Sequence, residues 1–239
     1  MTFPAVLSVE EQQITTPAQS YSIAMPATVS AGDLLIMFVT HDQDNTAAFD
    51  SVSGWTELRN ALWGNLAQGR LGIWYKSASG SEGGTNVTVS FTGSNRPACA
   101  FVVRIQAGTW NTGSAPELAA ANDVSANANP DPPNLAPSWG SDDNLWIVYE
   151  VNDQDRSINA YPTNYGSNQS FAWISGQTDD HTTALATREA AAASENPGTF
   201  TISTSDQWGA VTLAVRGSAA APQSQAPRTM HQQRMRRAA

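Results

Sequence analysis

The 239-residue chain has little of several features that define common protein classes. Its single cysteine, Cys99, excludes an intrachain disulfide, so a buried core must supply the stability. Cys99 lies in an apolar run, which favours a small buried side chain over a nucleophile. No run approaches the roughly 18 apolar residues that a membrane-spanning helix needs. Only 14% of residues are charged while 41% are hydrophobic, which indicates a globular fold with a neutral polar surface and no membrane partner.

Targeting and catalytic signatures are also missing. The N-terminus has no basic segment, and Glu10 and Glu11 come too early for the apolar core of a signal peptide. No G-x-S-x-G, H-E-x-x-H or P-loop motif occurs. Of the three histidines, only His41 and His181 precede the C-terminal tail. We therefore expect a protein that is not an enzyme and is made in the cytoplasm without a signal peptide.

Short β-type runs dominate the sequence instead. Residues 34–39 are continuously apolar, as in a strand buried on both faces, and residues 86–91 alternate as in a half-buried strand. Helical signals are weak, because only the alanine-rich segments 116–121 and 188–194 allow a turn or two of helix. The pattern predicts an all-β fold. Its other runs are residues 70–76, 100–105, 145–149, 170–174, 199–203 and 210–215.

The sequence repeats itself once. Leu34-Leu35-Ile36 followed by Asp42-Gln43-Asp44 matches Leu145-Trp146-Ile147 followed by Asp153-Gln154-Asp155, at an offset of 111 residues. Further matches keep the same order as far as Val103-Arg104 and Val215-Arg216, at an offset of 112. This regularity predicts a jelly-roll-like antiparallel β-sandwich with a pseudo-twofold internal repeat.

The repeat also predicts the domain organisation. We expect one sandwich over residues 1–216, with a first half at about 5–108 and a second at about 118–216. Two small tandem domains remain the alternative. Residues 217–239 are low in complexity and basic, which predicts a separate C-terminal arm.

Several motifs carry a resemblance to a known group. They are P-x-x-V-x-x-G-D-L-L at residues 26–35, G-W-T at 54–56, W-Y-K-x-A at 74–78, a Glu-Gly turn leading to an alternating strand at 82–90, P-x-x-Y-G at 162–166 and a closing strand at 208–215. In this order they resemble a group of phage and bacterial jelly-roll-like structural proteins of virions or surfaces. The resemblance covers roughly residues 5–216 and leaves out the arginine-rich tail.

This resemblance implies a phage virion protein. The first expectation is a capsid decoration (cement) protein that binds major capsid or tail protein, or further copies of itself in a lattice. A tail- or fibre-associated carbohydrate-binding module for host attachment is the alternative, and a glycan hydrolase is a third. A hydrolase needs two carboxyls at the scissile bond. We expect structural roles for Glu82 and Glu195 in repeated turns, and an arginine partner for Glu150.

The C-terminal tail differs in charge from the rest of the chain. It holds four arginines and no acid. Because the whole chain has a net charge of −9, the remainder has a net charge of −13. An acidic body disfavours nucleic acid, which only the arm could contact. We expect the arm to dock on a neighbouring subunit through arginine–carboxylate pairs and buried methionine. The residues expected to bind are Arg228, Met230, Arg234, Met235, Arg236 and Arg237.

The sequence contains two kinds of candidate ligand site. Asp42, Asp44, Asp153 and Asp155 follow equivalent strands, and oxygens at such spacing suit one Ca²⁺ per half; solvated turns are the other interpretation. No other cofactor is expected. Three tryptophans in polar, glycine-rich contexts are candidates for stacking on a glycan: Trp63, Trp110 and Trp139. The remaining five are expected in the core: Trp55, Trp74, Trp146, Trp173 and Trp208.

Overall fold

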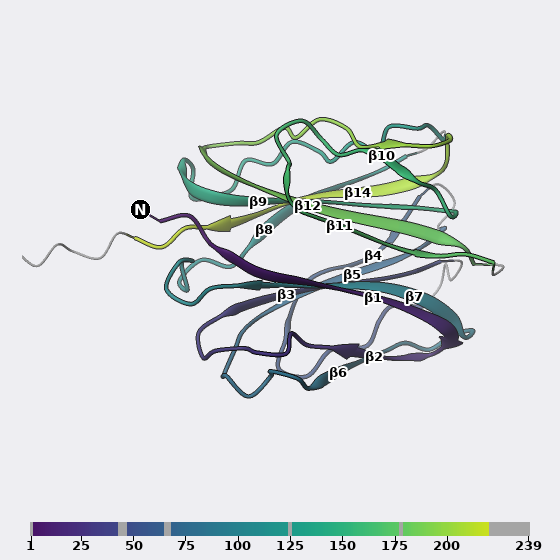
Figure 1. Ribbon diagram of the computed structural model, residues 1–239, viewed down its shortest axis with the longest axis horizontal. Helices are drawn as coiled ribbons and strands as arrows, with labels where there is room; N and C mark the ends of the chain where they lie inside the picture. Colours follow the sequence, from purple (N-terminus) through teal and green to yellow (C-terminus); the bar gives the residue numbers. More distant parts are fainter. Residues whose placement is uncertain (1, 43–46, 65–67, 124–125, 177–178, 220–239) are drawn as a thin grey trace, which may run out of the picture.

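The computed structural model describes residues 2–42, 47–64, 68–123, 126–176 and 179–219, and the regular structure in these ranges is β-strand (Figure 1). The predicted all-β class is therefore confirmed. The helical option for the alanine-rich segments is wrong, since they lie in strands β8 (Glu117–Asn122) and β12 (His181–Ala192). Pairing with neighbouring strands overrides their alanine content. In the described ranges, no helix has the length and apolar character to span a membrane.

The first half forms one large antiparallel sheet in the order β1-β7-β3-β5-β4. A small sheet of β2 (Ser20–Ala24) and β6 (Asn86–Ser90) covers its outer face. The chain thus passes from the large sheet to the small one and back twice. The large sheet contains β1 (Val6–Ala18), β3 (Leu34–Asp42), β4 (Thr56–Trp63), β5 (Gly69–Ser77) and β7 (Arg96–Ile105).

The second half repeats the large sheet and has its own pair of short outer strands. Its large sheet has the order β11-β12-β9-β14-β8, and β10 (Ile158–Ala160) pairs with β13 (Thr201–Ile202) outside it. Shifting each strand of the first large sheet by 111 or 112 residues reproduces this order, so the internal repeat is confirmed. The remaining large-sheet strands are β9 (Asp142–Asn152), β11 (Ser167–Ile174) and β14 (Trp208–Arg216).

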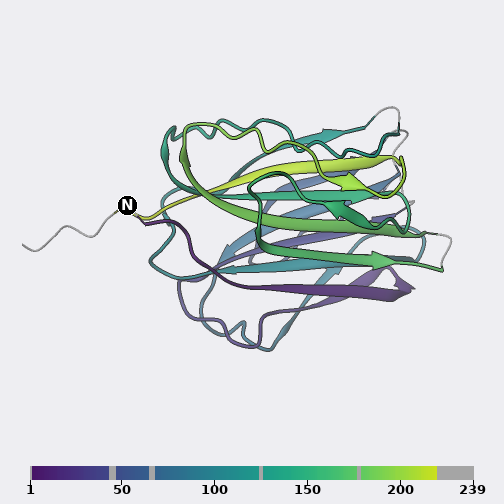
Figure 2. The same ribbon diagram turned by 45° about the horizontal axis from the view of Figure 1, so that its top comes forward.

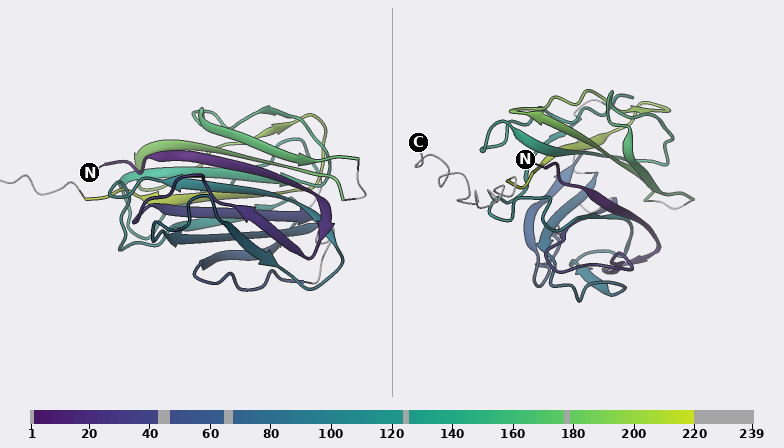
Figure 3. Two further views of the ribbon diagram at one scale, coloured as in Figure 1. Left: turned by 60° about the horizontal axis from the view of Figure 1, so that its bottom comes forward. Right: turned by 60° about the vertical axis from the view of Figure 1, so that its left-hand side comes forward.

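The two large sheets pack face to face, with a small sheet on each outer side (Figures 1 and 2). β1 lies beside β11 at one margin, and β4 lies beside β8 at the other. Figure 3 shows the first half and the second half as two stacked bodies that share this central interface. The molecule therefore has four layers.

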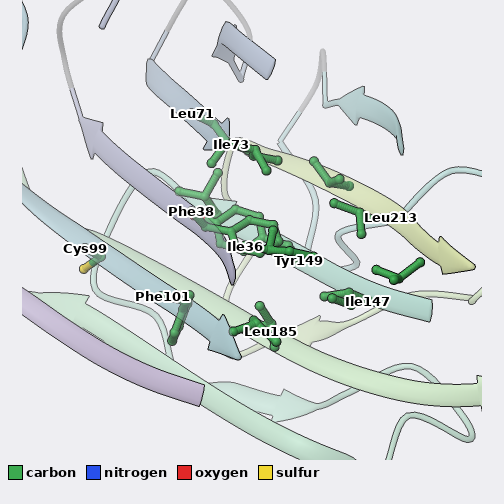
Figure 4. Close-up of a cluster of buried hydrophobic side chains, with 14 of the residues drawn as sticks. Ile36, Phe38, Leu71, Ile73, Cys99, Phe101, Ile147, Tyr149, Leu185 and Leu213 are labelled. Carbon is green, nitrogen blue, oxygen red and sulfur yellow. The ribbon is translucent and has the colours of Figure 1, made fainter. Parts of the chain in front are cut away.

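An aromatic pair marks the centre of the interface between the large sheets. Phe38 stacks on Tyr149 with ring centroids 5.1 Å apart and planes at 15° (Figure 4). These residues are 111 positions apart, so each ring stacks on its own repeat equivalent. Cys99 lies in the same cluster and is buried, as predicted. Burial raises the pKa of its thiol, so it stays protonated. The shared core thus lies on the approximate twofold axis.

Each large sheet has a second core on its outer face. In the first half, alternate residues of β3, such as Leu35 and Met37, pack against Tyr21 and Val89 of the small sheet. In the second half, Trp146 and other alternate residues pack under the outer layer. This double cover explains why β3 is buried along its whole length, as the apolar run predicted.

Repeated ion pairs hold the turns. Glu82 binds Lys76 at 2.8 Å and accepts hydrogen bonds from Ser79 and Gly80. These bonds outweigh burial and lower the pKa of Glu82 to about 2. Glu195 binds Arg188 at 2.6 Å in the second half. Both glutamates therefore have the structural role that the sequence predicted.

Candidate functional site

Both ends of the described chain are fixed at one end of the sandwich. The Thr2 amide donates to the Ser218 carbonyl at 3.3 Å, and the Ser218 amide donates to Thr109 at 3.0 Å. Gly217 forms a β-bridge with Trp110. The folded body therefore continues to Ser218, two residues beyond the predicted boundary at 216, because these backbone groups are satisfied by the first half. The candidate arm residues from Arg228 to Arg237 lie outside the described residues.

Gly217→Ala is expected to lower the free energy of unfolding by about 1–3 kcal/mol. A Cβ atom at this position would clash with the backbone carbonyl oxygens of Asp143 and Thr2. The matched control is Gly166→Ala, whose added Cβ would meet nothing within 4 Å. Urea titration of both variants measures the difference. Equal stability of the two variants would contradict the close backbone packing around Gly217.

The predicted calcium ligands are arranged differently from expectation. Asp42 and Asp153, one from each half, share a side-chain hydrogen bond, which needs a proton on one carboxyl. Burial and the nearby Asp206 raise the pKa of Asp153 to about 6. Asp155 is exposed, and Asp44 lies outside the described residues. Within the described ranges, no three His, Cys, Asp or Glu side chains gather as a metal site would require. The structure thus joins two carboxyls across the halves.

The three tryptophans predicted to stack on glycans do not form an exposed platform. Trp63 is fully buried against Gly209 of the opposite sheet, where an added Cβ would lie 2.6 Å from its Cβ atom. Trp110 is 4% exposed and donates its indole N–H to the Gly32 carbonyl at 2.9 Å. The prediction is wrong for these two, because contacts distant in sequence bury them. Trp139 is half-buried and donates to Asn144 at 2.9 Å.

An exposed aromatic pair lies elsewhere, on β11. Phe171 is 46% exposed and Trp173 is 37% exposed, which corrects the expectation that Trp173 is a core residue. Their rings stack with centroids 5.2 Å apart and planes at 19°. The alternation of the strand indicates this arrangement, because Ala172 and Ile174 fill the inner face. We name Phe171 and Trp173 the aromatic edge.

A hollow of about 350 Å³ adjoins the aromatic edge. Tyr161, whose hydroxyl donates to the Ser170 carbonyl at 3.2 Å, lies in its wall. Burial, with smaller contributions from Glu150 and Glu11, raises the pKa of Tyr161 to about 12. Its hydroxyl is therefore neutral near pH 7. The hollow is lined by Ser157, Ile158, Tyr161, Gln169 and Phe171.

Glu150 is the most strongly perturbed carboxyl near this surface. It is fully buried on the outer face of β9, and burial raises its pKa to about 8. Its Oε2 accepts from Asn152 at 3.1 Å, while Oε1 has no hydrogen-bond partner among the described residues. The expected arginine partner is therefore wrong: Asn152 takes that place. Because of this raised pKa, the Glu150 carboxyl is neutral near pH 7.

Comparisons with known proteins give no family. No family model matches the chain, and the search of curated proteins found no match.

Proposed function

We propose that the protein is a structural component of a phage particle, a capsid decoration protein held to neighbouring subunits by its C-terminal arm. The observation that carries the proposal is the fixed exit of the chain. Thr2, Thr109 and Trp110 hold Gly217 and Ser218 at one end of the sandwich. The basic segment that follows therefore starts from a defined point on a rigid body.

The body suits a passive support. Its two halves share one apolar interface, and each has a further core under its small sheet. Ion pairs brace each half: Arg104 binds Asp33 at 2.7 Å in the first half, and Arg216 binds Asp142 at 2.7 Å in the second. Arg96 and Asp179 join the two halves at 2.9 Å. Such a body keeps its shape when neighbours bind.

Charge indicates what the arm contacts. The arm contributes four arginines to a chain whose remainder carries a net charge of −13. Arginine binds carboxylates through paired hydrogen bonds, and methionine fills irregular apolar grooves. Arginine alone would bind phosphate equally well, but the methionines need an apolar groove, and an acidic neighbouring subunit can supply both. A further copy of this body is itself such an acidic surface.

Truncation after residue 219 is expected to leave a folded body and to remove the protein from assembled particles. The truncated chain keeps every described contact of Gly217 and Ser218, so its melting temperature should match that of the full chain. Particles propagated with each version, purified on a density gradient and quantified by mass spectrometry, measure incorporation.

A full-length variant with its four tail arginines changed to glutamine is the matched control for arm length. It should be lost from particles as the truncated chain is, because it lacks the charge. Truncated protein retained in particles at normal stoichiometry would refute the docking role. Full-length protein absent from particles would refute the virion assignment itself.

A further inference from the structure

The aromatic edge stands out from the rest of the described surface. Among the described residues, the exposed large hydrophobic side chains are Leu7, Phe171 and Trp173, and only the last two adjoin each other. Their near-parallel rings stack on each other and form one compact apolar patch. Exposed apolar groups that adjoin in this way mark binding surfaces more often than isolated ones do.

The register of the sheet explains why the aromatic edge is open. Phe171 pairs with Ala184, and Trp173 pairs with Thr182 on the adjacent strand β12. Ala184 and Thr182 are buried, because the outer layer covers β12. β11 is the edge strand, so the cover stops beside it. The rings therefore lie next to the margin of the outer layer, where the hollow begins.

The fold does not require aromatic residues at these positions. The repeat equivalents, 111 positions earlier on β4, are Asn60 and Leu62. In the first half, the Asn60 side chain binds the backbone of Phe49: it accepts from the amide at 3.2 Å and donates to the carbonyl at 2.9 Å. The second half has Phe171 at the position of Asn60. The aromatic edge is thus a feature added to a common architecture.

The hollow offers polar groups beside the apolar face. Gln169 donates its amide to the Tyr165 carbonyl at 2.7 Å, which fixes its position, and Ser157 contributes a hydroxyl. Tyr161 is fixed through Ser170, whose own hydroxyl donates to Glu11 at 2.7 Å. A ligand with an apolar ring face and hydroxyl groups along its rim matches this combination.

Charge favours a neutral ligand. Eight of the 12 Lys and Arg residues precede the tail, and six of these form ion pairs with carboxylates. The carboxylate of Glu11 lies near the hollow through Ser170. An anionic ligand would meet repulsion from an acidic body whose cations are mostly paired with carboxylates.

We propose that the aromatic edge and the adjoining hollow bind a neutral oligosaccharide. The apolar face of a pyranose ring packs against the outer surface of this stacked pair, and its hydroxyl groups reach Gln169 and Ser157 in the hollow. The two rings are stacked with centroids 5.2 Å apart, so they act as one apolar patch. The site is independent of the C-terminal arm, so it would function whether or not the arm docks.

Affinity electrophoresis of the full chain tests the proposal. The probes are gels that contain soluble starch, laminarin, xyloglucan or galactomannan, with alginate as the anionic probe. We expect at least one neutral polysaccharide to retard the protein and alginate to leave it unretarded. Titration calorimetry with a hexasaccharide of the retarding polymer then gives the dissociation constant.

Phe171→Ala and Trp173→Ala should each raise that dissociation constant by about tenfold, the size expected for loss of one stacking ring. Trp173→Phe keeps a flat ring and should retain most of the affinity. The matched control is Leu7→Ala, which removes an exposed apolar side chain outside the aromatic edge and should change nothing. The three positions are all exposed, so the four variants should fold, which melting curves verify.

Several outcomes overturn the proposal. One is migration of the full chain that no neutral polysaccharide alters. Another is retardation that persists unchanged in Phe171→Ala and Trp173→Ala. Retardation by alginate alone would assign an anionic ligand instead. Sedimentation that shows self-association, lost in Trp173→Ala, would make the aromatic edge an interface between copies.

Discussion

Phe38→Ala is expected to lower the free energy of unfolding by about 3–5 kcal/mol, and to do so for both halves of the molecule together. The Phe38 ring is fully buried and stacks on Tyr149 from the other half. Its removal leaves a cavity between the two large sheets. Each sheet relies on the other to cover its inner face, so weakening this contact weakens both halves.

Unfolding in urea, followed by tryptophan fluorescence and far-ultraviolet circular dichroism, measures the loss. Hydrogen exchange resolved to β5 and β12 reports on the first and second half separately. Phe171→Ala removes the same side chain from an exposed position and should cost much less. If Phe38→Ala reduced protection in β5 while β12 kept its full protection, the halves would be independent domains.

The repeat seen in the sequence makes Phe38 and Tyr149 equivalent, and the structure shows that their rings stack. The offset of 111 residues equates these positions, and the alternation of each strand places both on the same kind of face. Strand order then repeats from one half to the other. Local pattern and internal symmetry were thus sufficient for the sandwich and its repeated turns.

The tryptophans show where local pattern is insufficient. Trp63 has a polar, glycine-rich context, yet it is buried because Gly209 of the opposite sheet leaves room for it. Trp173 lies in an apolar run, yet it is exposed because β11 is an edge strand. Sheet order and contacts between distant segments decide both cases. The repeat offered one signal for the exposure of Trp173. It equates Trp63 with Ile174, both of which face the interface between the large sheets, so the neighbouring Trp173 points to the outer face.

Glu150→Gln is expected to stabilise the protein increasingly as pH rises from about 5 to about 8. The pKa of Glu150 is raised from 4.5 to about 8, chiefly by burial and to a smaller extent by the negative charge of Asp206. The folded state therefore holds a proton that the unfolded state has released across this range. Folding is favoured by that proton below pH 4.5, and the benefit is lost as pH rises through 8.

The magnitude is large for a single side chain. A difference of this size between folded and unfolded pKa corresponds to about 5 kcal/mol, all of it lost from the wild type above pH 8. Glutamine keeps the shape and carries no charge, so the variant escapes this loss. Ala184 and Ala210 flank Glu150 on the neighbouring strands and offer no counter-charge.

Urea unfolding of wild type and Glu150→Gln at intervals between pH 5 and pH 9 measures this difference. His181 acts in the opposite direction at lower pH, because burial lowers its pKa from 6.5 to about 4 and stability falls as pH drops through that range. Both proteins contain His181, so its contribution cancels when their stabilities are subtracted. Glu189→Gln, which changes an exposed glutamate on β12, is the control, and its free energy of unfolding should change with pH as that of wild type does.

A stability difference between Glu150→Gln and wild type that stays constant with pH would show that Glu150 ionises alike in the folded and unfolded states. Its burial beside Asn152 would then impose no charge penalty, and the neutral carboxyl assigned to the outer face of β9 would be wrong.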